Sequence, residues 1–210
     1  MSSTEENRRP IKARSTIWAQ SLAQFLARNN VSPNQISAAS VVVAAMGAAA
    51  LLLLPTIVGL ITCAVAIQLR LICNLLDGMV AIEGGKKSAL GQLYNEFPDR
   101  LADSIFIVAL GYAIDVPWLG WLGALAAALT AYVRVFGGAV GLTQDFRGPM
   151  AKQHRMAVLT VACIAGAIEW SAWRTQNGLT IAAYVIAFGA LITCITRTLV
   201  IARQLNHPER

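Results

Sequence analysis

The chain has 210 residues, of which 56% are hydrophobic and only 13% are charged. A soluble domain carries about 25% charged residues, so this composition excludes an ordinary water-soluble globular protein. Several apolar runs approach the roughly 20 residues that a spanning helix needs. The alternation of apolar and polar residues that marks a transmembrane β-barrel is missing. We therefore expect an all-α, polytopic membrane helical bundle.

The net charge of +6 bears first on membrane orientation, because Lys and Arg near helix ends favour the cytoplasmic side. Nucleic-acid binding is disfavoured, since the basic residues are scattered among apolar segments. The four cysteines lie inside apolar runs without CxxC spacing, and we interpret them as buried, inert thiols. No apolar core precedes a cleavage site near the N-terminus, so we expect no cleaved signal peptide.

Residues 1–30 are expected to form a polar N-terminus and an amphipathic helix. This helix is too short and too polar to span a membrane, and two places are open to it: the membrane interface or a packing site on the bundle. The apolar face consists of Ile17, Trp18, Leu22, Phe25 and Leu26. We favour the interface because nearby cations would face anionic lipid. These cations are Arg8, Arg9, Lys12, Arg14 and Arg28.

Residues 31–205 are expected to hold six transmembrane helices, with Pro33 and a cap at Ser32 or Asn34 setting the start of the first. The expected spans cover about 36–54, 57–76, 103–114, 119–140, 156–170 and 179–201. The third is short unless residues 91–103 are already helical. A polar tail follows at 206–210.

The distribution of charge predicts which ends of these spans face the cytoplasm. The N-terminal region, the polar segment 77–100, the loop 142–155 and the tail are basic. The loops near Pro55, Pro117 and Gln176 hold a single Arg174 between them. Six spans with both termini in the cytoplasm therefore satisfy the positive-inside rule, and the segment 77–100 faces the cytoplasm.

Two stripes of oxygen-bearing and small side chains follow helical spacing around that segment. The first consists of Asn74, Asp77, Gly78 and Ala81, and the second of Gly91, Asn95, Asp99 and Asp103. Helix capping explains any one of them, but acids in series near a membrane are expensive and usually functional. Their hard oxygens suit Mg²⁺, Mn²⁺ or Ca²⁺, and the small residues leave room for a ligand.

These residues resemble the signature of the CDP-alcohol phosphotransferase family, D-x-x-D-G-x-x-A-R, eight residues, then G-x-x-x-D-x-x-x-D. The chain reads Asn74-x-x-Asp77-Gly78-x-x-Ala81-Ile82, eight residues, then Gly91-x-x-x-Asn95-x-x-x-Asp99. Every spacing is kept. The departures are Asn74, Asn95 and Ile82, which replace two aspartates and the arginine. They suggest a variant branch similar to bacterial inner-membrane members of the family.

The resemblance implies a membrane transferase. It would move a phosphatidyl or other substituted phosphate group from a CDP-linked lipid such as CDP-diacylglycerol to the hydroxyl of a small or lipid alcohol, releasing CMP in phospholipid biosynthesis. One or two Mg²⁺ or Mn²⁺ ions would be held by Asn74, Asp77, Asn95 and Asp99. Asp99 would also be the catalytic residue, ligating metal or taking the proton of the acceptor.

Other residues are expected to contact substrate or to restore charge. Gly78 and Ala81 would line the nucleotide pocket, and Glu83, Glu96 and Asp103 would compensate for the missing aspartates. The full set of expected substrate contacts is Gly78, Ala81, Gly91, Asp103, Glu96, Arg70, Arg134 and Lys152.

Several polar residues have two open interpretations. Arg70 either holds a phosphate or pairs with an acid such as Asp77. Arg134 either binds the phosphate of an acceptor or reaches toward the interface. The loop cations Arg147, Lys152 and Arg155 suit an anionic acceptor or lipid headgroups, and the positive-inside rule alone also explains them. His154 is interpreted as a loop histidine and Glu169 as an interface residue on the far side.

Two alternative functions compete with the transferase. A catalytically degenerate family member would act as a lipid-binding or partner subunit, as the three departures suggest. A transporter is disfavoured because the acids cluster at one membrane face. The expected setting is the bacterial inner membrane, with the active site facing the cytoplasm, membrane lipids around it and a homodimer possible.

Overall fold

In the computed structural model, which describes residues 16–83 and 91–206, every regular element is an α-helix. The helices are α2 (Ile17–Arg28), α3 (Pro33–Leu53), α4 (Thr56–Glu83), α5 (Gly91–Ala113), α6 (Pro117–Ala139), α7 (Lys152–Trp173) and α8 (Asn177–Asn206). Within the described ranges, α3, α4, α6, α7 and α8 are long and apolar enough to cross a membrane. The chain is thus a polytopic helical membrane protein.

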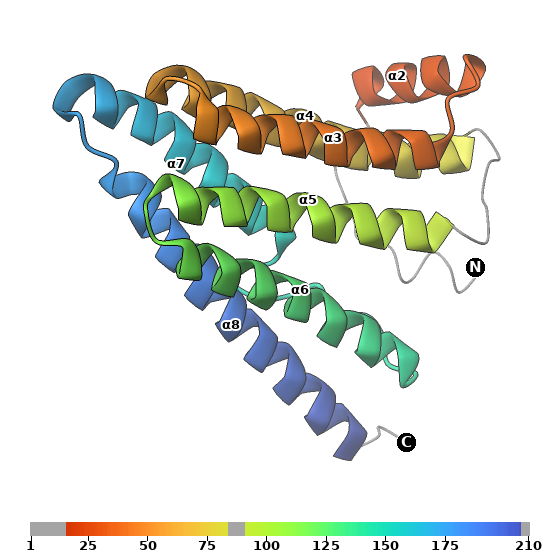
Figure 1. Cartoon of the computed structure of the whole chain (residues 1–210). Coiled ribbons are helices and arrows are strands. Elements are labelled where there is room, and N and C mark those ends of the chain that lie inside the picture. Colours follow the sequence, from red (N-terminus) through yellow and green to blue (C-terminus); the bar gives the residue numbers. More distant parts are fainter. Residues whose placement is uncertain (1–15, 84–90, 207–210) are drawn as a thin grey trace.

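Six of these helices form a closed ring around one apolar core (Figure 1). Each helix packs against two neighbours, in the order α3, α4, α7, α8, α6, α5 and back to α3. The central side chains include Leu60, Ile67, Phe106, Met156 and Ile186, all almost completely buried. Because the chain runs back and forth, the end of α4 and the start of α5 lie at the same end of the bundle (Figure 1).

The helices differ from the expected spans mainly at their ends. Helix α4 continues to Glu83 and α5 begins at Gly91, so much of the expected polar segment 77–100 is helical. Helix α7 begins at Lys152, four residues before the expected start. The helical spacing of the two stripes predicted this continuation for residues 74–81 and 91–103, whereas the early start of α7 was not predicted. Asp99, Lys152 and Asn74, which belong to these polar stretches, pair inside the bundle.

Helix α5 carries Glu96, Asp99, Arg100 and Asp103 in its first half and is not among the five apolar candidates. The predicted count of six spans is therefore confirmed for five helices only. The expected third span, 103–114, corresponds to the apolar second half of α5.

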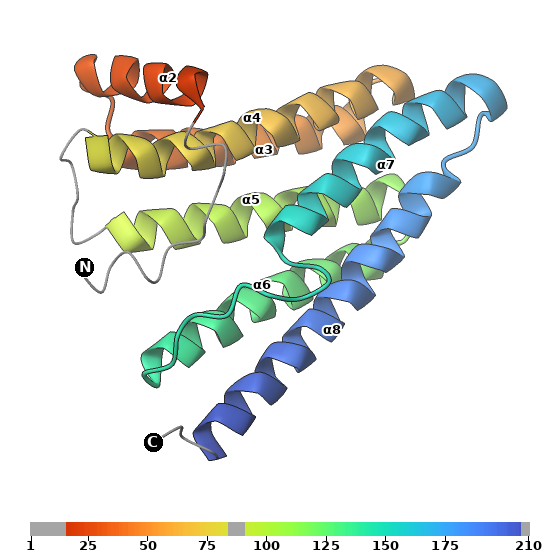
Figure 2. The same ribbon diagram turned by 180° about the vertical axis from the view of Figure 1, so that it is seen from behind.

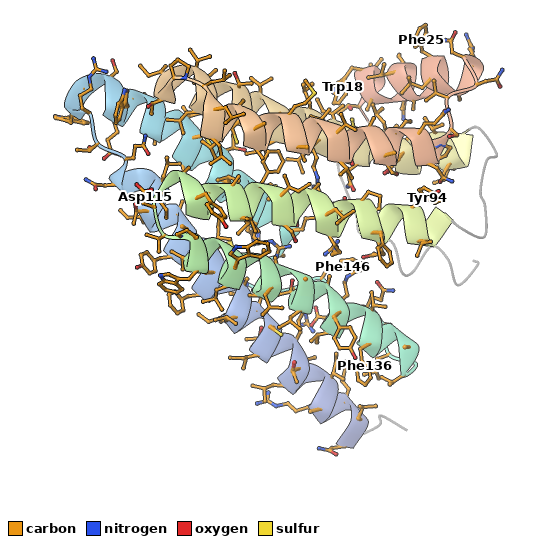
Figure 3. All side chains as sticks on the ribbon, in the orientation of Figure 1. Trp18, Phe25, Tyr94, Asp115, Phe136 and Phe146 are labelled. Carbon is orange, nitrogen blue, oxygen red and sulfur yellow. The ribbon has the colours of Figure 1, made fainter. Side chains whose placement is uncertain are left out.

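Helix α2 packs on α4 through small residues and exposes its large ones (Figure 3). Ala19 and Ala23 are completely buried, whereas Ile17 is 82% exposed and Phe25 is 61% exposed. Of the predicted apolar face, only Leu26 packs into the cluster beneath α2. The helix thus packs on the bundle through alanines on one side while its other side stays apolar and exposed, and its place in the membrane interface stays a prediction.

The start of α3 is fixed by a capping box. The Ser32 hydroxyl accepts a hydrogen bond from the Gln35 backbone at 3.2 Å, and the Gln35 side chain accepts one from the Ser32 backbone at 2.8 Å. Pro33 occupies the first helical position, which needs no N–H donor. This cap sets the register of α3 and therefore of Ser37, one turn further along.

A buried ion network joins three helices. Arg70 of α4 is completely buried and pairs with Asp99 at 3.0 Å and Asp103 at 2.9 Å, both on α5. Arg155 of α7 pairs with the other oxygen of Asp103 at 3.0 Å. Arg155 was expected at the surface with the loop cations, but it is 1% exposed. The shift occurs because α7 begins early enough to point Arg155 inward.

Helices α5 and α6 approach closely at a pair of glycines. A Cβ atom added to Gly120 would lie 2.9 Å from the Ile107 carbonyl oxygen and 3.0 Å from the Gly111 Cα atom. These neighbours are backbone atoms and cannot move aside easily. The absence of side chains at Gly111 and Gly120 therefore sets the distance between the two helices.

We predict that Gly120→Ala lowers the free energy of unfolding by about 1 to 3 kcal/mol, because the added methyl group overpacks a backbone contact. Gly166→Ala is the matched control. Its nearest neighbours are leucine side-chain carbons at 3.5 Å, so ordinary contact and the helix preference of alanine should leave stability unchanged or raised. Thermal unfolding in detergent measures both, and equal effects of the two substitutions would contradict the account.

Asp103→Asn is predicted to cost about 3 kcal/mol or more, because it leaves the buried Arg155 without its carboxylate. The same change at Asp145, whose partner Arg147 is exposed, should cost under about 1 kcal/mol. Unfolding of both variants by heat in the same detergent gives the comparison. A stable Asp103→Asn protein would show that the network does not hold the helices together.

Candidate active site

Four helices bring polar side chains together where α4 ends and α5 begins. Ser37 comes from α3, Asn74 and Asp77 from α4, Asp99 from α5 and Lys152 from the first turn of α7. The two predicted stripes therefore meet, and α3 and α7 each add one residue. This arrangement follows from the ring, in which α3 and α7 are the two neighbours of α4.

Asp77 is a buried carboxylate with one engaged and one available oxygen. Its Oδ2 accepts a hydrogen bond from the Ser37 hydroxyl at 2.7 Å. Its Oδ1 is buried and, apart from the adjacent Gly78 backbone, meets no donor among the described residues. A buried carboxylate oxygen without a donor is costly, so this atom is suited to a bound cation.

Lys152 links Asn74 to Asp99. Its Nζ donates to the Asn74 side-chain oxygen at 2.9 Å and contacts Asp99 Oδ2. The other oxygen of Asp99 accepts from Arg70 at 3.0 Å. Both oxygens of Asp99 are thus engaged by cations. The Lys152 and Asp99 side chains are each 12% exposed, so water screens their interaction only weakly.

Arg134 of α6 is held by three groups beside this site. It donates to Glu96 and to Gln144, each at 2.5 Å. Its guanidinium also lies 5.1 Å from the ring centre of Phe146, which Figure 3 labels. The sequence left Arg134 between phosphate binding and reaching toward the interface. In the structure it joins α5 to the segment that follows α6.

The segment between α6 and α7 runs back along α6 before α7 begins (Figure 2). The Met150 backbone donates to Thr193 at 2.9 Å, and Arg197 donates to the Arg147 carbonyl oxygen at 2.8 Å. Partial burial raises the pKa of Asp145, but hydrogen bonds from Arg147 outweigh it and keep that pKa below its usual value. The fixed segment places Lys152 well inside the bundle.

The remaining predicted residues are distributed around this centre. Gly78, Ala81 and Gly91 are half-buried at the adjoining helix ends. Among the described residues, Asp103 pairs with Arg70 and Arg155 deeper in the bundle, and its expected contact with substrate stays a prediction. Arg8, Arg9, Lys12 and Arg14 lie outside the described residues, as do Lys86, Lys87 and the side chains of Glu83 and Asn95.

Two other sequence interpretations can be compared with the structure. His154 lies in the first turn of α7, where its ring contacts the Pro149 carbonyl oxygen at 3.0 Å. Glu169 accepts hydrogen bonds from Thr175 and from the backbones of Asn177 and Gly178, so it fixes the start of α8. Neither residue takes part in the centre around Asp77.

The sequence reading did not single out Ser37, Arg100 or Gln144. Ser37 lies one turn after the capped start of α3. Because it is a polar residue on the inner face of that helix, the sequence could have indicated it as a candidate site residue. Arg100 lies 3.6 Å from Glu96 and from Asp99. No sequence pattern indicated Gln144, because it reaches Arg134 only through the path of the segment between α6 and α7.

The donor atoms of the described residues fit a divalent ion at Asp77. Among the described residues, no group of three or more His, Cys, Asp or Glu side chains is arranged to hold a metal. Asp77 Oδ1 is the available carboxylate oxygen of this centre, whereas the oxygens of Asp99 are paired. An anionic ligand such as a phosphate group could complete the coordination of an ion at Asp77.

Comparison with known proteins shows which proteins the chain is similar to. No family model matches it. It is 32% identical over 190 residues to an archaetidylinositol phosphate synthase of Aeropyrum pernix, covering 90% of this chain and 92% of that protein. It is 28% identical over 197 residues to a phosphatidylinositol phosphate synthase of Streptomyces avermitilis, covering 87% of this chain and 77% of that protein.

The fold is similar to that of Mycobacterium tuberculosis phosphatidylinositol phosphate synthase. The TM-score is 0.75 at 19% identity for its complex with manganese and citrate, with 88% of each chain covered. It is 0.73 at 18% identity for the form with CDP-DAG bound, covering 87% of this chain and 92% of that one. The retained motif spacing and the similarity along nearly the whole chain confirm the resemblance: the protein belongs to the CDP-alcohol phosphotransferase family.

Proposed function

We propose that the protein transfers a phosphatidyl or similar phosphate group from a CDP-linked lipid to an alcohol, releasing CMP. The observation that carries this proposal is the available Asp77 oxygen beside the Lys152–Asp99 pair, at positions that match the family signature. The named relatives support it, since both are synthases of inositol-phosphate lipids. The solved neighbour with CDP-DAG bound supports a donor of this kind.

The donor pyrophosphate would be held between Asp77 and Lys152. A divalent ion at Asp77 Oδ1, Mg²⁺ or Mn²⁺, would neutralise phosphate charge. The manganese complex of the structural neighbour supports the use of such an ion. Lys152 would hold a phosphate oxygen from the opposite side, while Ser37 fixes the Asp77 carboxylate. Asn74 and Asn95 would add neutral oxygens, and the lipid tails would remain in the membrane.

The acceptor hydroxyl would approach Asp99. This carboxylate lies between Arg70 and Lys152, whose contacts fix its orientation. An ionised carboxylate at this place can accept the proton of the attacking hydroxyl. Arg134 and Glu96 would border the acceptor side. Gly78, Ala81 and Gly91 would leave room for the nucleotide.

The orientation in the membrane is also a proposal. Helix α5 would be the sixth span, its charged first half sheltered by the arginines of α4 and α7. Both termini and the candidate site would face the cytoplasm of the bacterial inner membrane, as the positive-inside rule favours. Helix α2 would lie in the interface, with Ile17 and Phe25 toward lipid.

Release of CMP tests the proposed reaction. We expect purified protein with CDP-diacylglycerol, Mn²⁺ and a panel of alcohols to release CMP, and Asp77→Asn and Asp99→Asn each to reduce the rate by about 100-fold or more. Asp115→Asn is the matched control. Asp115 is an exposed turn residue at the opposite end of the bundle, labelled in Figure 3, and its substitution should leave the rate unchanged.

The same assay separates the alternatives. An acceptor that stimulates release identifies the product. If no CMP appears with any acceptor while CDP-diacylglycerol still binds, the protein is the non-catalytic lipid-binding member instead. Equal rates for wild type and Asp77→Asn would place the chemistry elsewhere.

Cysteine accessibility tests the orientation. In a chain whose four native cysteines are replaced, a cysteine at Gln153 should react with a membrane-impermeant reagent only after the cells are opened. A cysteine at Gln176, in the turn between α7 and α8, should react in intact cells. The reverse pattern would place the site on the outer face.

A further inference from the structure

We propose that the Lys152 ammonium occupies a cation position of the active site, so that the protein binds one divalent metal ion per chain rather than two. This inference rests on the proposed function, because it concerns the ion that the donor would need. It goes beyond that function by assigning part of the charge neutralisation to a side chain.

The contacts of Lys152 are those that a small cation would make. Its Nζ lies between the Asn74 oxygen and Asp99 Oδ2, which come from two different helices. It also acts electrostatically on Asp77. A compact ammonium with three donors can replace a metal ion as a point charge between oxygens. An ion added at the same place would compete with Lys152 for both oxygens.

The charges of the buried centre are already balanced. The carboxylates of Asp77, Asp99 and Asp103 face the cations of Arg70, Lys152 and Arg155. Two divalent ions would leave a large uncompensated positive charge at a poorly hydrated site, even after an anionic pyrophosphate binds. One divalent ion leaves a modest positive charge that the pyrophosphate of the donor can neutralise.

The asparagine at position 74 agrees with this assignment. An aspartate there would form an additional ion pair with Lys152 and would place a second negative charge beside that of Asp99. The neutral Asn74 oxygen accepts a hydrogen bond from Lys152 at 2.9 Å without adding a negative charge that demands a second ion. The asparagine that replaces the first aspartate of the family signature is thus hydrogen-bonded to Lys152 of α7, and the two residues act together.

The position of Lys152 is fixed by contacts beyond the site. Arg155, one turn later, donates to the Met150 carbonyl oxygen at 2.8 Å, and the Met150 backbone donates to Thr193. These bonds hold the chain on both sides of Lys152. The ammonium is therefore positioned before any ligand arrives, as a resident cation must be.

The test is the number of Mn²⁺ ions bound per chain. Electron paramagnetic resonance of free Mn²⁺ is followed during titration of the purified protein with CDP-diacylglycerol present. We expect one ion for wild type and for Asn74→Asp, in which Lys152 still occupies the position. We expect two ions for the double variant Asn74→Asp with Lys152→Met, which adds one negative charge and removes the ammonium.

Arg147→Gln is the matched control, because it removes a cation that is 79% exposed and pairs only with Asp145. It should leave the count at one. If the double variant does not fold, Lys152→Met alone should bind its single Mn²⁺ about tenfold more tightly, because a nearby cation is gone. Two ions or none in wild type, one ion in a folded double variant, or unchanged affinity in Lys152→Met would overturn the inference.

This count is independent of turnover. A protein that binds one ion without releasing CMP supports the inference about Lys152 while the proposed reaction fails. A protein that releases CMP with two bound ions supports the reaction while the inference fails.

Discussion

The structure depends on Asp103, a carboxylate buried between Arg70 and Arg155. It joins α4, α5 and α7 inside the bundle. Removing Asp103 would leave Arg155 without its carboxylate in a poorly hydrated place, so this residue holds the three helices together. Because Arg70 also holds Asp99, the same pairing that packs the helices positions a carboxylate of the site.

The site is built in layers from this pairing outward. Asp103 lies deepest, Asp99 follows one turn nearer to the helix end, and Lys152 links Asp99 to Asn74. Arg134 and Glu96 close the α6 side. The deep ion pair between Arg70 and Asp99 is shielded from water because both side chains are largely buried. The outer pair between Arg134 and Glu96 is more exposed to solvent. Such a gradient suits a donor whose charged group is bound while its lipid tails stay in the membrane.

Much of this could be predicted from the sequence. Hydropathy predicted the apolar helices, and the motif spacing predicted that Asn74, Asp77 and Asp99 lie close together. Both predictions depend on local periodicity in the sequence. The sequence did not predict that α7 begins as early as Lys152. It also did not predict the burial of Arg155 or the place of Lys152 between Asn74 and Asp99. These features depend on partners far apart in the chain, which no local pattern specifies.

The central claim is that the donor binds between Asp77 and Lys152 with a single metal ion. An experimental structure of the protein with CDP-diacylglycerol and Mn²⁺, with manganese located by anomalous scattering, tests it most directly. The account predicts one manganese peak at Asp77, a pyrophosphate beside it and Lys152 still in contact with Asp99. Two peaks with Lys152 turned away, or a donor bound elsewhere, would contradict it.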